Sequence, residues 1–263
     1  MIRTNGLFDG EDHIITEQKG MFRVIEHQRD LTVSPSTAMY EYFMSKMEVR
    51  RKQLLAVLDG NQGVTIQAGA MQWMAGNVHA TTGIKGAGDL FGKVVKGIAT
   101  KESAIKPEYV GSGYLMLEPT YKYLLLEDVS DWAGGLVVED GMFLASEGSV
   151  KHSMQARSTV SSVVAGNEGL FNLKLEGHGV AVLESNVMRR QLIEVNLQDD
   201  VLKVDGNLAV CWSGSLRFTV ERSGKTLIGS AVSKEGLVNV YSGTGQILLS
   251  PLDDSSSLFA ATH

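Results

Sequence analysis

The fold of this chain is decided by the stretch Gly111–Pro119 (GSGYLMLEP), which returns as Gly177–Ser185 (GHGVAVLES) and again as Gly243–Pro251 (GTGQILLSP). The three copies are equally spaced, because 177 − 111 = 66 and 243 − 177 = 66. In each copy a glycine pair leads into a run of apolar and β-forming residues, which is typical of a strand that begins at a tight bend. A fixed period of this length predicts one supersecondary unit that is used repeatedly.

The segments around the copies are also similar. Asn167–Asn172 (NEGLFN) and Lys234–Asn239 (KEGLVN) match before the second and third copies, and a degraded copy begins at Gly20. We therefore predict three units at about 20–100, 101–166 and 167–232, followed by a half-unit at 234–252, with a polar lead-in at 1–19 and a tail at 253–263. Because a half-unit has unpaired strand edges, we expect it to close against the first unit or to cap a subunit interface.

Composition places the chain among soluble globular proteins. Of its 263 residues 43% are hydrophobic and 21% are charged, and the net charge of −6 argues against a nucleic-acid partner. The single cysteine, Cys211, excludes an internal disulfide and fits a reducing compartment, so we expect a cytoplasmic protein. The sequence shows no signal peptide and no apolar run long enough to span a membrane.

One substantial helix is predicted, at about 36–51. Ser34-Pro35 suits a helix start, and four apolar residues share one face at helical spacing: Met39, Tyr42, Phe43 and Met47. The other units make this connection in a few residues, so the helix is an insertion. We expect it to pack over an open end of the sheets, and a partner-binding helix is the alternative.

A second unusual stretch, 83–101, combines glycines with Lys85, Lys93 and Lys96. It does not fit a P-loop, because the spacing from Gly86 is one residue too long and Val94 stands where a Mg²⁺-binding Ser or Thr is required. We interpret it as a glycine-rich connection. The alternative is a short amphipathic segment whose lysines face a subunit contact or an anionic surface.

The sequence contains no convincing catalytic or metal site. The six histidines are not paired at zinc-site spacing, and there is no Gly-x-Ser-x-Gly elbow. His178 occupies the place of Ser112 and Thr244 between two glycines, which favours a solvent-facing turn over catalysis. Asp140-Gly141 and Asp205-Gly206 predict hairpin turns. We interpret the three tryptophans as core or edge cover: Trp73, Trp132 and Trp212.

These segments together resemble the mitochondrial-biogenesis (altered inheritance of mitochondria) family, also called the tryptophan-attenuation-protein-like (TRAP-like) family of unknown function. The resemblance covers roughly residues 20–252 and rests on Glu168–Asn172, Asp205–Ala209, Glu235–Asn239, Asp140–Ala145 and Ala68–Met71 with the glycine pairs. It implies an all-β body of three β-sandwich-like units in a pseudo-threefold arrangement. It supplies no enzymatic activity, and the acidic charge gives no reason to carry over a tryptophan site or RNA contacts.

We therefore expect an all-β, non-enzymatic protein that acts by assembly or binding, as a homo-oligomer, with no catalytic residue, cofactor or metal. Six glycines are the predicted structural hinges: Gly111, Gly113, Gly177, Gly179, Gly243 and Gly245. One alternative is a small-ligand or anionic-membrane binder that uses Lys85, Lys93 and Lys96. The last is a metal-dependent enzyme of double-stranded β-helix type.

Overall fold

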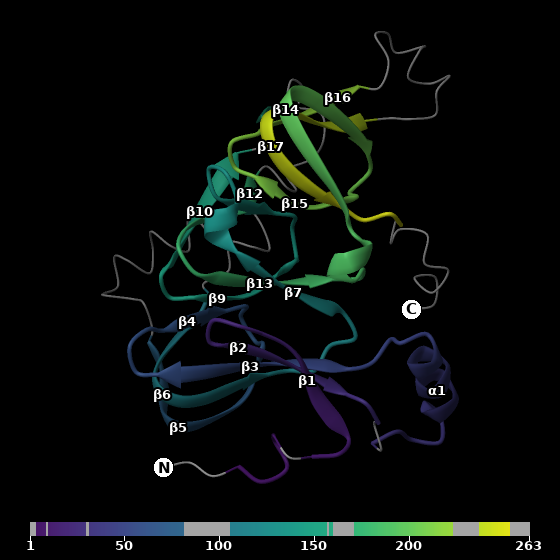
Figure 1. The fold of residues 1–263 in the computed structure, drawn as a ribbon, viewed down its shortest axis with the longest axis vertical. Coiled ribbons are helices and arrows are strands. Elements are labelled where there is room, and N and C mark those ends of the chain that lie inside the picture. The colour runs from purple at the N-terminus through teal and green to yellow at the C-terminus, as the bar shows by residue number, and fades with distance from the viewer. Residues whose placement is uncertain are drawn as a thin grey trace.

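The structure, a computed structural model, describes residues 4–8, 10–29, 32–81, 106–156, 158–159, 171–222 and 237–252. In these ranges it is almost entirely β, as predicted. Two curled sheets are stacked along the long axis of the molecule, and a short helix, α1, stands out at one side of the lower sheet (Figure 1). The two sheets share no strand, so the chain passes between them at turns.

The lower sheet is antiparallel throughout, in the order β1-β2-β3-β6-β4-β9-β13-β7, with β5 added to β6. Main-chain hydrogen bonds between Lys52 and Thr120, at 2.7 and 2.9 Å, bring the β7 end of the sheet back toward β3. The sheet therefore curls around its own apolar core. Its strands are β1 (His13–Lys19), β2 (Phe22–His27), β3 (Lys52–Asp59), β4 (Val64–Ile66), β5 (Met71–Thr81), β6 (Glu108–Leu117), β7 (Tyr123–Asp128), β9 (Phe143–Glu147) and β13 (Val180–Ser185).

The upper sheet has the order β10-β12-β8-β15-β17-β16-β11, with β14 added to β17. Its core is built around Trp212, Phe218 and Tyr241, whose ring centroids lie 5.0–5.4 Å apart. Two short 3₁₀ turns, η2 (Val129–Asp131) and η3 (Arg189–Gln191), lie in connections. The strands are β8 (Leu136–Val138), β10 (Val150–Ala156), β11 (Ser158–Thr159), β12 (Phe171–Gly177), β14 (Ile193–Asp205), β15 (Ala209–Ser213), β16 (Arg217–Arg222) and β17 (Leu237–Leu249).

A third core joins the two sheets. Strands β7, β9 and β13 are buried on both faces, so alternate residues of their apolar runs enter different cores. In β13, Val180 and Val182 pack inside the lower sheet, whereas Ala181 and Leu183 pack against residues of the upper sheet such as Leu175 and Cys211. The Trp132 and Trp212 side chains are buried in these cores, and Trp73 packs against a smaller apolar cluster, as the sequence predicted.

The glycine pairs mark the places where a strand changes partner. β5 pairs along almost the full length of β6, but the other edge of β6 pairs with β4 before Gly111 and with β3 from Ser112 onward. β17 changes partner in the same way. One of its edges pairs with β14 along most of the strand, while the other edge pairs with β16 before Gly243 and with β15 after it. At Gly177 the chain leaves the upper sheet as β12 and enters the lower sheet as β13.

Glycine is required at these bends because the first residue of each pair has a positive φ. The values are +120° at Gly111, +102° at Gly177 and +116° at Gly243, a region that L-residues with a Cβ rarely adopt. At Gly111 a Cβ would also lie 1.8 Å from the carbonyl oxygen of Asn77 on β5. The first glycine of each pair therefore has a backbone conformation that favours glycine, whereas the hinge role of all six glycines and the threefold arrangement of sandwich-like units stay predictions.

Several expectations about the ends of the units are wrong. The C-terminal half-unit does not close against the first unit, because β17 lies in the interior of the upper sheet between β14, β15 and β16. The other expectation for it, that it caps a subunit interface, stays a prediction. Gly141 and Gly206 have the expected positive φ, but the strands on either side of each turn pair with other strands and not with each other. Part of the expected lead-in, His13–Lys19, forms β1.

Candidate binding site at α1

The helix α1 (Ala38–Lys46) is shorter than the predicted 36–51 and does not pack on the sheets. None of its residues is buried. Four large apolar side chains of α1, and Met47 just beyond its end, are exposed, from 56% at Tyr42 to 77% at Met47; the other three are Met39, Tyr40 and Phe43. The Met44 side chain is half-buried. The expected packing over an open end of the sheets is therefore wrong, since the apolar face points to solvent.

Polar contacts hold α1 to the lower sheet instead. The Glu41 carboxylate accepts a hydrogen bond from Arg51 Nη2 at 2.9 Å and another from the Tyr121 hydroxyl. Arg51 Nε donates to the same hydroxyl at 2.7 Å. Burial and the hydrogen bond to Glu41 raise the pKa of Tyr121. The anchored side of the helix is thus its polar side, which is the reverse of the usual amphipathic arrangement.

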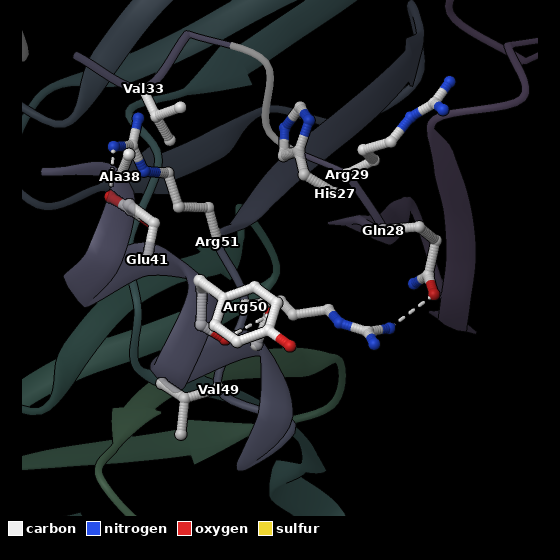
Figure 2. Close-up of a pocket in the computed structure, with 11 residues that line it drawn as sticks. His27, Gln28, Arg29, Val33, Ala38, Glu41, Val49, Arg50 and Arg51 are labelled. Atoms are coloured by element: carbon white, nitrogen blue, oxygen red, sulfur yellow. Dashed lines mark hydrogen bonds and ion pairs between the residues drawn. The ribbon is translucent and has the colours of Figure 1, made fainter. Parts of the chain in front are cut away.

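A hollow of about 280 Å³ lies between α1 and the ends of β2 and β3 (Figure 2). Arg29, Arg50 and Arg51 all reach its walls, but each is already paired: Arg29 with Asp12 at 2.6 Å, Arg50 with Gln28 Oε1 at 2.6 Å, and Arg51 with Glu41. The arginines that line the hollow therefore form ion pairs and hydrogen bonds within the protein, and they are not arranged as an anion-binding site. Its other lining residues are His27, Val33, Ala38, Tyr42, Ser45 and Val49.

A second hollow, of about 320 Å³, lies beyond Val49, which lines both. Its walls are mainly apolar and aromatic, and Tyr121, Tyr123, Val187, Pro251 and Leu252 are among them. The last of these, Leu252, is exposed. Apolar side chains are therefore exposed both on the outward face of α1 and at Leu252 beside this hollow.

Beneath this surface lies a buried lysine that the sequence did not single out. Lys52 Nζ is 3.4 Å from Glu26 Oε2 and 4.3 Å from the centroid of the Tyr123 ring. Burial lowers the pKa of Lys52, and the Glu26 carboxylate opposes that shift. A buried ammonium group with both an ion pair and an aromatic ring is a satisfied structural charge.

The structure also brings together a serine and a histidine that sequence reasoning missed. Ser146 Oγ on β9 and His152 Nε2 on β10 share a hydrogen bond of 2.8 Å, and the Phe143 ring stands 5.1 Å from the imidazole. Burial, with a smaller effect of Lys106, lowers the pKa of His152 to about 4. Ser146 is fully buried, and no carboxylate in the described ranges hydrogen-bonds the imidazole. The pair is therefore a polar bond within the core, since a substrate cannot reach the hydroxyl.

A buried carboxylate, Glu147, contacts the backbone at the second glycine pair, Gly177 and Gly179. Its two oxygens accept hydrogen bonds from the main-chain N–H groups of Met21 and Val180, each at 3.0 Å. The first lies in the β1–β2 turn and the second follows Gly179, so one side chain ties the start of the chain to the β12–β13 bend. A Cβ on Gly179 would lie 2.9 Å from this carboxylate, which explains why the second glycine is needed here.

The other predicted residues fall into two groups. The lysines of the alternative binding surface, Lys85, Lys93 and Lys96, lie outside the described residues. His178 is exposed in the bend between β12 and β13, in keeping with a solvent-facing turn. Within the described ranges no three metal-binding side chains gather, and no helix there is long and apolar enough to cross a membrane.

Comparisons with known proteins agree with this architecture. An uncharacterized protein from Streptococcus pyogenes serotype M6 is 26% identical over 203 residues, which is 74% of this chain and 79% of that protein. The X-ray crystal structure of a Streptococcus pyogenes protein superposes with a TM-score of 0.58 at 24% identity, covering 79% of this chain and 90% of that one. The family described as mitochondrial biogenesis AIM24 matches residues 46–252, which is most of the sequence. The chain therefore belongs to the mitochondrial biogenesis AIM24 family.

Proposed function

We propose that this protein acts by assembly or binding and not by catalysis, and that α1 is the element that binds a protein partner. The observation that carries the proposal is the orientation of α1. Polar contacts through Glu41 fasten the helix to the sheet, while Met39, Phe43 and Met47 face solvent. None of the α1 side chains is buried in the protein core, and polar contacts hold the helix in a fixed place. Such a helix is suited to present its side chains to another molecule.

The exposed apolar side chains of α1 are sufficient to contribute substantially to the free energy of binding. Complete burial of one Phe or Met side chain contributes roughly 1.5–3 kcal/mol. Burial of several such side chains would offset the free-energy cost of association, and micromolar affinity requires only about 8 kcal/mol in total. Aromatic residues and methionine are also the types enriched in protein interfaces. The partner we infer is a protein with an apolar groove that receives the outward face of α1, as in other helix-in-groove complexes.

A site-specific crosslinking experiment tests this proposal. A photo-crosslinking residue placed at Met47 is expected to capture one defined protein in cells, whereas the same residue at Ile193, an exposed apolar position on β14, is expected not to capture it. The captured protein is then purified and its binding is measured by calorimetry. The double variant Phe43→Ser, Met47→Ser should bind it at least about tenfold more weakly, and Ile193→Ser should bind it normally.

Two results would contradict the proposal. Equal affinity of the purified partner for the wild type and for the α1 double variant would show that the helix is not the contact. Flotation of the protein with anionic vesicles that depends on Phe43 and Met47 would instead identify a lipid surface. The cytoplasmic location expected from the sequence stays a prediction.

A further inference from the structure

Two long strands at the edges of the sheets differ in a way that bears on assembly. Among the described residues, β5 pairs with β6 alone and β14 pairs with β17 alone, so each has one free side. An edge strand exposes unpaired N–H and C=O groups and is a template for pairing with another chain. Proteins that stay monomeric protect such edges with charges and bulges.

The β14 edge has both kinds of protection. Its pairing with β17 is interrupted by a bulge between Leu197 and Asp200, where Asp199 takes a positive φ of +51°. Five charged side chains stand along its length: Glu194, Asp199, Asp200, Lys203 and Asp205. The remaining long edges are charged as well, with Glu17 and Lys19 on β1 and Lys151 on β10. A second chain that approached any of these edges would meet charge.

The β5 edge has no charged residue in its eleven positions, Met71–Thr81 (MQWMAGNVHAT). From Trp73 to Thr81 it pairs with β6 one residue to one, so its bulge is confined to the first two residues. Six of its residues are exposed, and Met74 places a 45% exposed apolar side chain near the middle. Gly76 interrupts the regular strand with a φ of +92°, but the one-to-one pairing with β6 continues through it. This edge is therefore uncharged and partly apolar, and beyond its first two residues it has no bulge.

We propose that β5 is the self-association edge of this protein and pairs antiparallel with β5 of a second copy about a twofold axis. The inference rests on the assembly part of the proposed function. The occupant is a second copy because identical strands meet here without like-charge repulsion, and because antiparallel pairing of the same edge closes into a symmetric pair. If β5 instead paired with β14 of another copy, the acidic and bulged edge of β14 would lie in the interface, which disfavours that arrangement.

Matched lysine substitutions on the two edges test the proposal. Met74 and Val201 are exposed to a similar degree, 45% and 51%, and lie on β5 and β14 respectively. With the full chain in analytical ultracentrifugation, we expect the wild type and Val201→Lys to form dimers with the same dissociation constant. Met74→Lys should raise that constant at least about tenfold, because it places a charge on each of the two strands that meet in the interface. Circular dichroism confirms that both variants are folded.

Hydrogen exchange of the unmodified protein supplies a second readout that does not depend on a variant. Amides in Met71–Thr81 should exchange more slowly at high protein concentration than at low concentration, while amides in β14 should be unaffected. A wild type that remains monomeric, or concentration-dependent protection that appears in β14 or α1 instead of β5, would overturn the proposal. The α1 double variant Phe43→Ser, Met47→Ser should still dimerise, so failure of the partner-binding proposal is separable from failure of this one.

Discussion

Strands β6 and β17 occupy the same place in the two sheets, and the comparison between them shows which features of the repeat are structural. Each has one long partner, β5 or β14, and each exchanges partners on its other edge at a glycine with φ near +120°. The bend is therefore common to both sheets. A bent strand lets one sheet curl around its core without breaking the backbone ladder.

The two strands differ in what lies around the bend. At Gly111 the neighbouring strand β5 approaches so closely that a Cβ would overlap the Asn77 carbonyl oxygen, whereas at Gly243 the nearest atoms are 3.9 Å away. Their long partners differ as well, because β14 is acidic and bulged and β5 is neither charged nor bulged beyond its start. A positive-φ glycine is therefore found in both central strands. In the lower sheet it lies against the closely packed, uncharged edge strand β5, and in the upper sheet it has more space and the edge strand β14 is charged and bulged.

The largest expected effect is the loss of stability in Gly111→Ala, which we compare with the loss in Gly243→Ala. Both variants carry the strain of a positive φ, which costs on the order of 1–3 kcal/mol. Gly111→Ala must in addition displace the β5 backbone, so we expect a total loss of about 3–5 kcal/mol in the free energy of unfolding. Urea unfolding followed by circular dichroism measures both. Equal losses in the two variants would show that the close approach of β5 to β6 is unimportant.

The next effect concerns the acid sensitivity of β10, which carries His152. His152 has a pKa of about 4 when folded and about 6.5 when unfolded, so the unfolded chain binds more protons between these values. Its contribution is fully present above pH 6.5 and is lost as the pH falls toward 4, by up to about 3 kcal/mol. We expect His152→Gln to flatten the dependence of unfolding free energy on pH in this window. The matched variant His178→Gln, at an exposed position outside β5, is the control for the removal of an imidazole.

A smaller effect is expected at Glu147, the carboxylate that contacts the bend between β12 and β13. Glu147→Gln keeps the shape of the side chain but replaces one acceptor oxygen with a donor, so one of the N–H groups of Met21 and Val180 loses its partner. An unsatisfied buried donor costs about 1–3 kcal/mol. Thermal and urea unfolding should show this loss, and the exposed carboxylate variant Glu118→Gln should show almost none. A stability equal to the wild type would mean that Glu147 does not hold the bend.

The smallest expected effect is a change in the labelling rate of Cys211. It tests whether the two sheets unfold together. Burial raises the pKa of Cys211 well above its usual value, so the native thiol should resist a thiol reagent until the core opens. Because the shared core joins β13 to β15, we expect Gly111→Ala in the lower sheet to accelerate labelling of Cys211 in the upper one. A labelling rate unchanged from the wild type would show that the sheets open independently.

The helix of the candidate site could be predicted from the sequence, but the direction in which its apolar face points could not. Ser34-Pro35 and the spacing of Met39, Phe43 and Met47 predicted a helix with one apolar face, and α1 is present. Periodicity shows that side chains share a face, and it does not show whether the surface that covers them belongs to the same chain. The orientation was set by Glu41, Arg51 and Tyr121, which meet across as many as 80 positions of sequence.

The sequence by itself determined the all-β class and the places of the bends, because a positive φ is a local property that glycine alone meets at little cost. Gly111, Gly177 and Gly243 could therefore be found by spacing. Only the tertiary structure decided which strands meet at each bend, which edge stays free of charge, and that Ser146 and His152 are buried as a pair. These outcomes depend on contacts between distant segments, whose energies no local pattern encodes.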